Sequence, residues 1–288
     1  MRSVRALALA AVVLPLVAGE ALAARILLTN DDGYDAPGIV ALAAALKKAG
    51  HDVTIVAPAA NRSGSSTAIT TAPFAVTKIA DKVYSVDGTP ATTVLYGVSV
   101  IFKDAAPDLV VSGTNTGANV GASTVLSGTV GNTVAAMTQF VPSIPAIAFS
   151  ADLLDADPTS AANKKQFATV AAYGAKLVAR LLKAEPKLGK VGRFALNVNW
   201  PGVTADKIAG VRYAVQGRAI TFSWGFREVS PGTWAISPSA APAQKDVVRS
   251  DSALLAKKFV TISVLDGDYT APAAVEAAVS AAVGRPTP

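Results

Sequence analysis

The sequence predicts an α/β fold: a doubly wound, mostly parallel, Rossmann-like sheet with an antiparallel β arm in the C-terminal third. Three observations predict this class. Short apolar runs alternate with segments of helical periodicity, and polar Gly-rich segments follow several of the apolar runs. In the C-terminal third of the chain, aromatic and small residues alternate as they do in an antiparallel strand. With 288 residues, of which 51% are hydrophobic and 16% are charged, the chain can bury a sizeable core.

The first predicted unit is a strand, a helix and a second strand. Residues 25–29 form a short apolar run that ends in a turn-forming segment, which is typical of a buried parallel strand. Asp35 is the expected N-cap of the next helix, Pro37 suits its first turn, and apolar positions recur as far as Leu46. Residues 53–57 form the second strand, which we expect beside the first and parallel to it.

The same alternation continues along the chain. Further strands are expected at residues 108–112, 147–149 and 194–198, and further helices at 128–139 and 161–183. A Gly-rich loop is expected directly after residue 112. The order favours a single domain over residues 24–288.

Residues 210–239 depart from this pattern. Aromatic and small side chains alternate up to Phe226, and Gly232 interrupts the alternation before it resumes at Trp234. A hairpin that covers the core and an arm exchanged with a second subunit both fit. Protruding aromatic side chains favour the arm, because they require a partner.

The N-terminus has the layout of a secretory signal. Arg2 and Arg5 precede the uncharged apolar run 6–18, and the small residues of Ala21-Leu22-Ala23 suit a cut after Ala23. An uncleaved anchor helix is the alternative, but the run is shorter than the roughly 20 residues that span a bilayer. Residues 1–23 are therefore expected to be a cleaved signal peptide, which predicts a periplasmic or secreted protein without membrane attachment.

Charge and residue usage exclude several classes of protein. Loss of the leader lowers the net charge from +6 to +5, because it removes Arg2, Arg5 and Glu20. This balance suits anionic substrates, but no basic run indicates a nucleic-acid polymer as partner. The chain has no cysteine, and its one histidine, His51, is expected on the surface. Thiol catalysis and phosphatase classes that need several histidines are excluded.

Three polar clusters follow predicted strands, at residues 30–33, 61–66 and 112–117, and a fourth at 127–129 opens a predicted helix. Ligands of open α/β sheets bind beyond the carboxyl ends of the strands. The adjacent carboxylates of Asp31 and Asp32 would repel each other unless a cation lay between them. Oxygen ligands alone favour Mg²⁺ or Mn²⁺.

Glycines in these clusters indicate an anion site beside the metal. Gly64, Gly113 and Gly117 would let backbone N–H groups approach a ligand, and a helix N-terminus adds to such a site. A metal beside an anion pocket favours hydrolysis of phosphate esters. Two alternatives are an exported anion- or nucleotide-binding protein without catalysis, and a partner-binding protein that acts through its aromatic arm.

Several of these segments resemble signature motifs of the SurE family. They are RILLTNDDGYDAPGI at 25–39, NRSGSS at 61–66, GTP at 88–90, PDLVVSGTN at 107–115 and SGTV at 127–130. The similarity continues more weakly through residues 196–199 and 250–263, so it spans nearly the whole chain after the leader. Ordered motifs of this length make coincidence a poor explanation.

The resemblance implies a metal-dependent phosphomonoesterase that hydrolyses nucleoside 5′- or 3′-monophosphates and, in some members, polyphosphate. It implies Asp31, Asp32, Ser63 and Asn115 as metal ligands. We expect Asp31 and Asp32 to be catalytic as well: both hold the ion, and one or the other accepts a proton from the attacking water. It places Ser127, Gly128 and Thr129 close to the phosphate, and we also expect Asn61, Ser63 and Gly64 at the substrate. The family's β arm and C-terminal swap imply a homodimer or homotetramer.

The sequence also departs from the family pattern. Leu126 stands where a Tyr usually precedes Ser-Gly-Thr-Val, and the acidic residue expected in the following helix is absent near Thr138 and Gln139. Many members lack a signal sequence, which makes a cytoplasmic location the alternative. These differences bear on substrate preference and compartment rather than on the metal ligands.

Overall fold

The computed structural model describes residues 23–188 and 192–283. Its main sheet has nine strands in the order β3-β4-β2-β1-β5-β6-β7-β11-β8. The strands are β1 (Arg25–Thr29), β2 (Asp52–Pro58), β3 (Val76–Ala80), β4 (Val83–Val86), β5 (Leu109–Thr116), β6 (Ala146–Ala151), β7 (Ala195–Trp200), β8 (Gly210–Ala214) and β11 (Phe259–Leu265). The expected doubly wound, mostly parallel sheet is confirmed.

The strand order reverses direction next to β1. β1 pairs in parallel with β2 on one side and with β5 on the other, and only the pairs β3–β4 and β7–β11 are antiparallel in this sheet. The chain therefore leaves β1 to one side and later returns on the other. Such a switch point opens a crevice at the carboxyl ends of β1 and β5.

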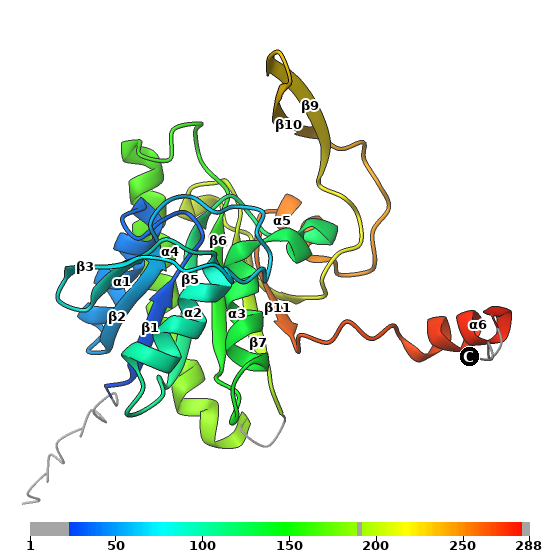
Figure 1. The fold of residues 1–288 in the computed structure, drawn as a ribbon. Helices are drawn as coiled ribbons and strands as arrows, with labels where there is room; N and C mark the ends of the chain where they lie inside the picture. The colour runs from blue at the N-terminus through cyan, green and yellow to red at the C-terminus, as the bar shows by residue number, and fades with distance from the viewer. Residues whose placement is uncertain (1–22, 189–191, 284–288) are drawn as a thin grey trace, which may run out of the picture.

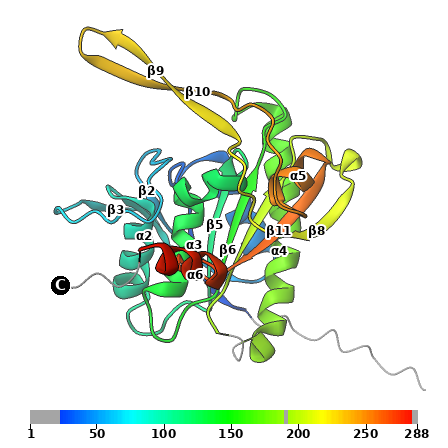
Figure 2. The same ribbon diagram turned by 90° about the vertical axis from the view of Figure 1, so that its right-hand side faces the viewer.

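Helices cover both faces of the sheet (Figures 1 and 2). They are α1 (Pro37–Lys48), α2 (Pro90–Tyr96), α3 (Gly128–Thr138), α4 (Ala161–Leu188) and α5 (Asp251–Ala256). A further helix, α6 (Ala273–Val283), has no buried residue and projects away from the sheet (Figure 1). Two apolar cores result. Leu42 and Phe167 from α1 and α4 pack with Ile26 and Leu28 in one core, whereas α2 and α3 pack against the opposite face around Leu27.

Short helical turns complete the connections. A π-helical turn (Gly97–Ile101) follows α2, a 3₁₀ turn (Gly121–Leu126) precedes α3, and another (Ala205–Lys207) precedes β8. Within the described part of the chain, no helix is both long and apolar enough to cross a membrane.

The two-stranded sheet β9–β10, Phe222–Ser230 and Thr233–Ala240, forms a hairpin that projects from the main body (Figures 1 and 2). The predicted arm boundary at residue 210 is wrong, because β8 pairs in parallel with β11 and belongs to the main sheet. The hairpin is also not a cover for the core. Phe226 is 66% exposed and Trp234 61% exposed.

Other predicted boundaries shift for identifiable reasons. Asp35 is not the N-cap of α1: Ala36 takes that position without a side-chain cap, and Pro37 at the first helical position lacks an N–H to be capped. The predicted loop after residue 112 is instead the end of β5, since Asn115 and Thr116 still pair with β6 after an irregularity. α4 extends to Leu188 rather than ending at 183.

Candidate active site

The loop after β1 holds Asp31 and Asp32 at the switch point. Ile26 and Leu28 anchor β1 in the core, so the strand ends at a fixed place. Asn30 then closes the turn: its Nδ2 donates to Gly33 O at 2.7 Å, and Gly33 N donates to its Oδ1 at 3.2 Å. The predicted turn therefore orients two adjacent carboxylates toward the crevice between β1 and β5.

Asp31 lies under the first turn of α3. Its side chain is 3% exposed, and Thr129 Oγ1 donates a hydrogen bond to its Oδ1. Burial raises the pKa of Asp31, although the hydrogen bond from Thr129 opposes the shift. A Cβ on Gly128 would lie 2.8 Å from the Asp31 Cβ, so this close approach requires glycine.

Asp32 links β1 to β5. Thr116 N donates to Asp32 Oδ2 at 3.0 Å, and Asn61 Nδ2 donates to Asp32 Oδ1 at 3.4 Å. Burial and the neighbouring charge of Asp31 raise the pKa of Asp32 to about 6, although the hydrogen bonds from Thr116 oppose the rise. The two carboxylates repel each other when both are ionised, and a bound cation would reduce this repulsion.

The second predicted cluster, after β2, lies against the first. Arg62 N donates to the backbone oxygen of Asp31 at 2.7 Å, and Ser63 N donates to Asn61 Oδ1 at 2.9 Å. Ser63 and Gly64 are exposed, and Gly64 has a φ of +80°, which favours glycine. The loop thus brings Asn61 to Asp32 and presents Ser63 to solvent.

Asn115 approaches from the end of β5. Its Nδ2 donates to the backbone oxygens of Thr116 at 3.3 Å and Gly117 at 2.8 Å, so its Oδ1 is the end suited to a cation. Gly113, two residues earlier, has a φ of +122°, and a Cβ there would lie 2.2 Å from Phe149 O. Glycine at 113 therefore serves the packing of β5 on β6 rather than direct contact with an anion.

The N-terminus of α3 completes the cluster. Ser127 is the N-cap, and its Oγ accepts from Val130 N at 3.1 Å. Ser127 and Thr129 are both buried. Of the predicted substrate contacts, the Ser127 side chain thus caps the helix and the Thr129 side chain holds Asp31. The backbone N–H of Ser127 donates to Thr124 O at 3.2 Å, and the Thr129 backbone also contacts the Asp31 carboxylate.

Two functional contacts were missed from the sequence. Fully buried Asn132 on α3 donates from Nδ2 to Asn30 O at 3.2 Å and to Ser112 Oγ at 3.0 Å, which ties the helix to both strands. The available signal in the sequence was an Asn within the predicted helix, four residues after Gly128. The Thr116 N–H was missed because it belongs to the backbone, whose partners have no sequence signal.

The donor set fits a hard divalent cation. Asp31, Asp32, Ser63 and Asn115 offer two carboxylates, one hydroxyl and one amide oxygen, which Mg²⁺ and Mn²⁺ prefer to nitrogen or sulfur ligands. Among the described residues no three His, Cys, Asp or Glu side chains gather as a metal cluster. A cation here would therefore depend on neutral oxygens as well as on the two carboxylates.

Comparison with known proteins agrees with this geometry. The family model described as survival protein SurE matches residues 26–222, which include every candidate site residue. A 5′-nucleotidase SurE of Cereibacter sphaeroides is 37% identical over 86% of this chain and 95% of its own, and 5′-nucleotidase SurE 1 of Burkholderia lata is 39% identical over 67% and 70%.

A solved structure supports the same assignment. The SurE protein from Aquifex aeolicus matches with a TM-score of 0.69 and 31% identity, covering 90% of this chain and 99% of that one. The fold and the site define an α/β protein with a two-carboxylate centre at its switch point. The chain belongs to the SurE family.

Proposed function

We propose that this protein is a hydrolase that releases phosphate from nucleoside monophosphates. The observation that carries the proposal is the placement of Asp31 and Asp32, at the switch point of a SurE-family sheet and beneath the N-terminus of α3. The curated relatives are named 5′-nucleotidases. The 5′-monophosphate is therefore the first substrate to test, with 3′-monophosphates and polyphosphate as further candidates.

Asp31, Asp32, Ser63 and Asn115 would hold a divalent ion, Mg²⁺ or Mn²⁺. When bound, such an ion polarises a phosphoryl oxygen and lowers the pKa of water. The raised pKa of Asp32 supports this assignment, since a cation would offset the repulsion between the two carboxylates.

The phosphate would lie at the start of α3. This helix has 11 residues, and its first backbone N–H groups carry the positive end of the helix dipole. Gly128 has no side chain, which lets Asp31 and Pro90 lie close against the start of this helix. The loop at Asn61, Ser63 and Gly64 would contact the phosphate from the opposite side.

Asp32 is the better placed of the two carboxylates to accept a proton from the attacking water. Asp31 is almost fully buried and bonded to Thr129, whereas Asp32 is half-buried and closer to solvent. Asp31 would then act as a ligand, with Thr129 fixing its orientation.

Phosphate release from a panel of nucleoside 5′- and 3′-monophosphates, with Mg²⁺, with Mn²⁺ and with EDTA, tests this function. We expect release that requires a divalent ion and stops with EDTA. Nucleotide binding without release under any ion would contradict the proposal and favour the alternative of an exported binding protein.

We further propose that the β9–β10 hairpin docks on a second copy of the chain, giving a homodimer or homotetramer. Its register places Phe226 opposite Ile236, and Trp224 and Trp234 lie at even spacing on the same face. These four side chains are 49–66% exposed. An apolar face of this kind needs cover in a water-soluble assembly.

A further inference from the structure

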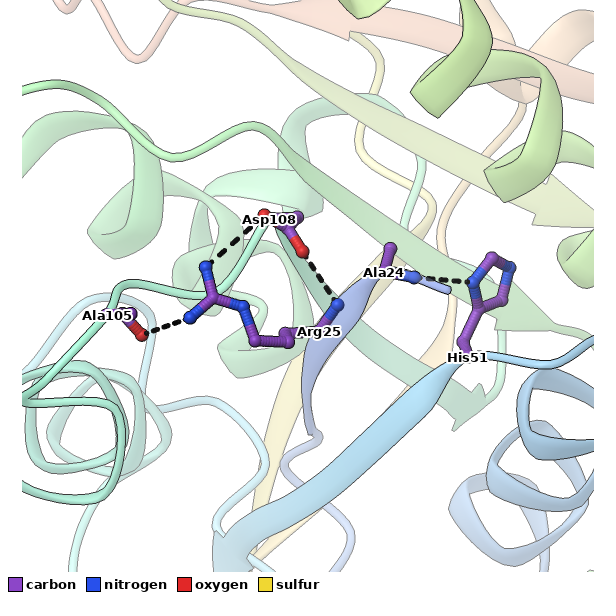
Figure 3. A network of polar contacts seen from close by, with 5 residues as sticks. All are labelled: Ala24, Arg25, His51, Ala105 and Asp108. Atoms are coloured by element: carbon purple, nitrogen blue, oxygen red, sulfur yellow. Dashed lines mark hydrogen bonds and ion pairs between the residues drawn. The ribbon is translucent and has the colours of Figure 1, made fainter. Parts of the chain in front are cut away.

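The start of β1 is held by the single histidine of the chain (Figure 3). The Ala24 nitrogen donates to His51 Nδ1 at 3.4 Å, and Asp52 N donates to the Ala24 oxygen at 2.9 Å. His51 is 7% exposed, so the predicted surface position is wrong. Both polar groups of Ala24 are thus bound by the segment that opens β2.

Exposure changes abruptly at the Ala23–Ala24 bond. Ala23 is exposed, whereas Ala24 is 6% exposed and belongs to the apolar core around α1. The small residues Ala21 and Ala23 suit a signal-peptide cut at this same bond. The signal-peptide pattern of the sequence and the boundary between exposed and buried residues therefore fall at the same peptide bond.

We propose that hydrolysis of the Ala23–Ala24 bond removes residues 1–23 and that the freed α-amino group of Ala24 stays in the fold as a hydrogen-bond donor to His51 Nδ1. One water is consumed: its oxygen forms the carboxylate of Ala23, and Ala24 keeps the amine. The mature chain would then begin one residue before β1, and its N-terminal amine would be bound by His51 within the fold. The inference does not depend on the nucleotidase activity.

The chemistry of His51 suits this role. Burial lowers the pKa of His51, so the imidazole is neutral at neutral pH and Nδ1 can accept. Nε2 then carries the proton, and it is buried without a partner among the described residues. The free amine can donate one N–H to the neutral imidazole in place of the backbone amide, and its remaining N–H groups would face solvent where exposed Ala23 is removed.

Charges around the site are already paired. Arg25 N donates to Asp108 Oδ2 at 2.7 Å, and the Arg25 guanidinium lies 3.5 Å from Asp108 Oδ1 (Figure 3). Asp52 pairs with Lys82 at 2.5 Å. A new positive charge at Ala24 would therefore lie among groups of both signs rather than in a field of one sign.

The first test is the mass of the exported chain. The full-length protein, with a C-terminal affinity tag that contains no histidine, is expressed in an export-competent bacterium and recovered outside the cytoplasm. We expect the intact mass of residues 24–288 plus the tag. A mature chain that begins elsewhere, or a chain that keeps residues 1–23, would overturn the proposal.

The second test observes the imidazole directly. Because the chain has one histidine, ¹⁵N-histidine labelling of the mature protein gives a single imidazole spectrum. We expect a protonated Nε2 and an unprotonated Nδ1 at neutral pH. A proton on Nδ1 would overturn the proposal, since that atom could not accept from the amine.

The third test measures the reactivity of the α-amino group toward an N-terminus-selective aldehyde. We expect His51→Ala to react about tenfold faster than wild type, a change that corresponds to loss of one hydrogen bond. His51→Asn, whose amide oxygen can replace Nδ1, should keep the slow rate. Equal rates in wild type and both variants would overturn the proposal, and the spectrum of the wild-type protein decides it if the variants do not fold.

Discussion

Asp32 Oδ2 accepts a hydrogen bond at 3.0 Å from the backbone N–H of Thr116, a residue 84 positions later in the chain. This bond joins the carboxyl ends of β1 and β5, the two strands that flank the switch point. It holds Asp32 from the main chain of β5, while side chains also hold the pair: Thr129 Oγ1 donates to Asp31 and Asn61 Nδ2 donates to Asp32.

Gly128→Ala should abolish most phosphate release. The added Cβ would lie 2.8 Å from the Asp31 Cβ and 2.9 Å from Pro90 Cγ, so Asp31 or the first turn of α3 must move. We expect a fall of at least about 100-fold in kcat/KM, because small displacements of reacting groups have effects of this size. The control is Gly232→Ala, which strains the backbone of the hairpin turn (φ +74°) but adds no contact at the site. Unchanged activity of Gly128→Ala would contradict the account.

Asp251→Ala should destabilise the loop that leads into α3. The buried Asp251 Oδ1 accepts from Gly121 N at 3.0 Å and from Gly217 N at 2.8 Å, so it joins that loop to the base of the hairpin. Loss of the acceptor leaves buried N–H groups unpaired, which should lower the free energy of unfolding by about 3 kcal/mol. Urea unfolding measures this, with the exposed Asp206→Ala as control; equal losses would argue against the bridge.

Asp246 should contribute to the acid sensitivity of the hairpin base. Burial raises the pKa of Asp246, but hydrogen bonds from Ser252 Oγ and from the backbone N–H groups of Arg218 and Val247 outweigh burial and bring its pKa to about 2. A lowered carboxyl pKa stabilises the fold above pH 4, and this contribution is lost as the pH falls from about 4 to 2.

The corresponding variant is Asp246→Asn. Its free energy of unfolding should be lower than that of wild type at pH 7, and the difference should shrink as the pH falls from 4 to 2. Chemical unfolding at a series of pH values measures the difference. A difference that stays constant over this range would show that the ionised form of Asp246 contributes nothing.

Phe226→Ser combined with Trp234→Ser should lower the oligomeric state. Both side chains lie on the apolar face of the hairpin, 66% and 61% exposed. Loss of two large aromatic groups from an interface should raise the dissociation constant by at least 100-fold. Sedimentation analysis measures the assembly, and Arg227→Ser, on the opposite face, should leave it unchanged. A variant that assembles like wild type would contradict docking through this face.

The sequence predicted the parts of the fold that have strong local signals. β1, β2 and α1 were found because apolar runs and helical periodicity marked them, and Asp31-Asp32 because two acids follow a buried strand. The β5 boundary was missed because Asn115 and Thr116 stay in the strand through pairing with β6, a long-range interaction. β8 was assigned to the arm because an edge strand with exposed Val211 and Tyr213 lacks the pattern of a buried one.

In the candidate site, too, local signals could be found in the sequence and long-range contacts could not. Residue types with ligand chemistry could be chosen from sequence, and the structure brings Asn61 and Thr129 into contact with Asp32 and Asp31. The burial of His51 could not be foreseen, because the residue that donates to it, Ala24, does so from its backbone and has no polar side chain to suggest a contact. Ser63 and Asn115 stay predicted ligands.

The central claim is that the Asp31–Asp32 pair binds a divalent ion and hydrolyses nucleoside monophosphates. The most direct measurement compares wild type, Asp32→Asn and the control Asp35→Asn in Mn²⁺ binding by calorimetry and in phosphate release from a 5′-monophosphate. Asp35 is exposed and makes a matched substitution three residues away. We predict that Asp32→Asn loses both binding and release while Asp35→Asn keeps both. An Asp32→Asn variant that releases phosphate at the wild-type rate would contradict the account.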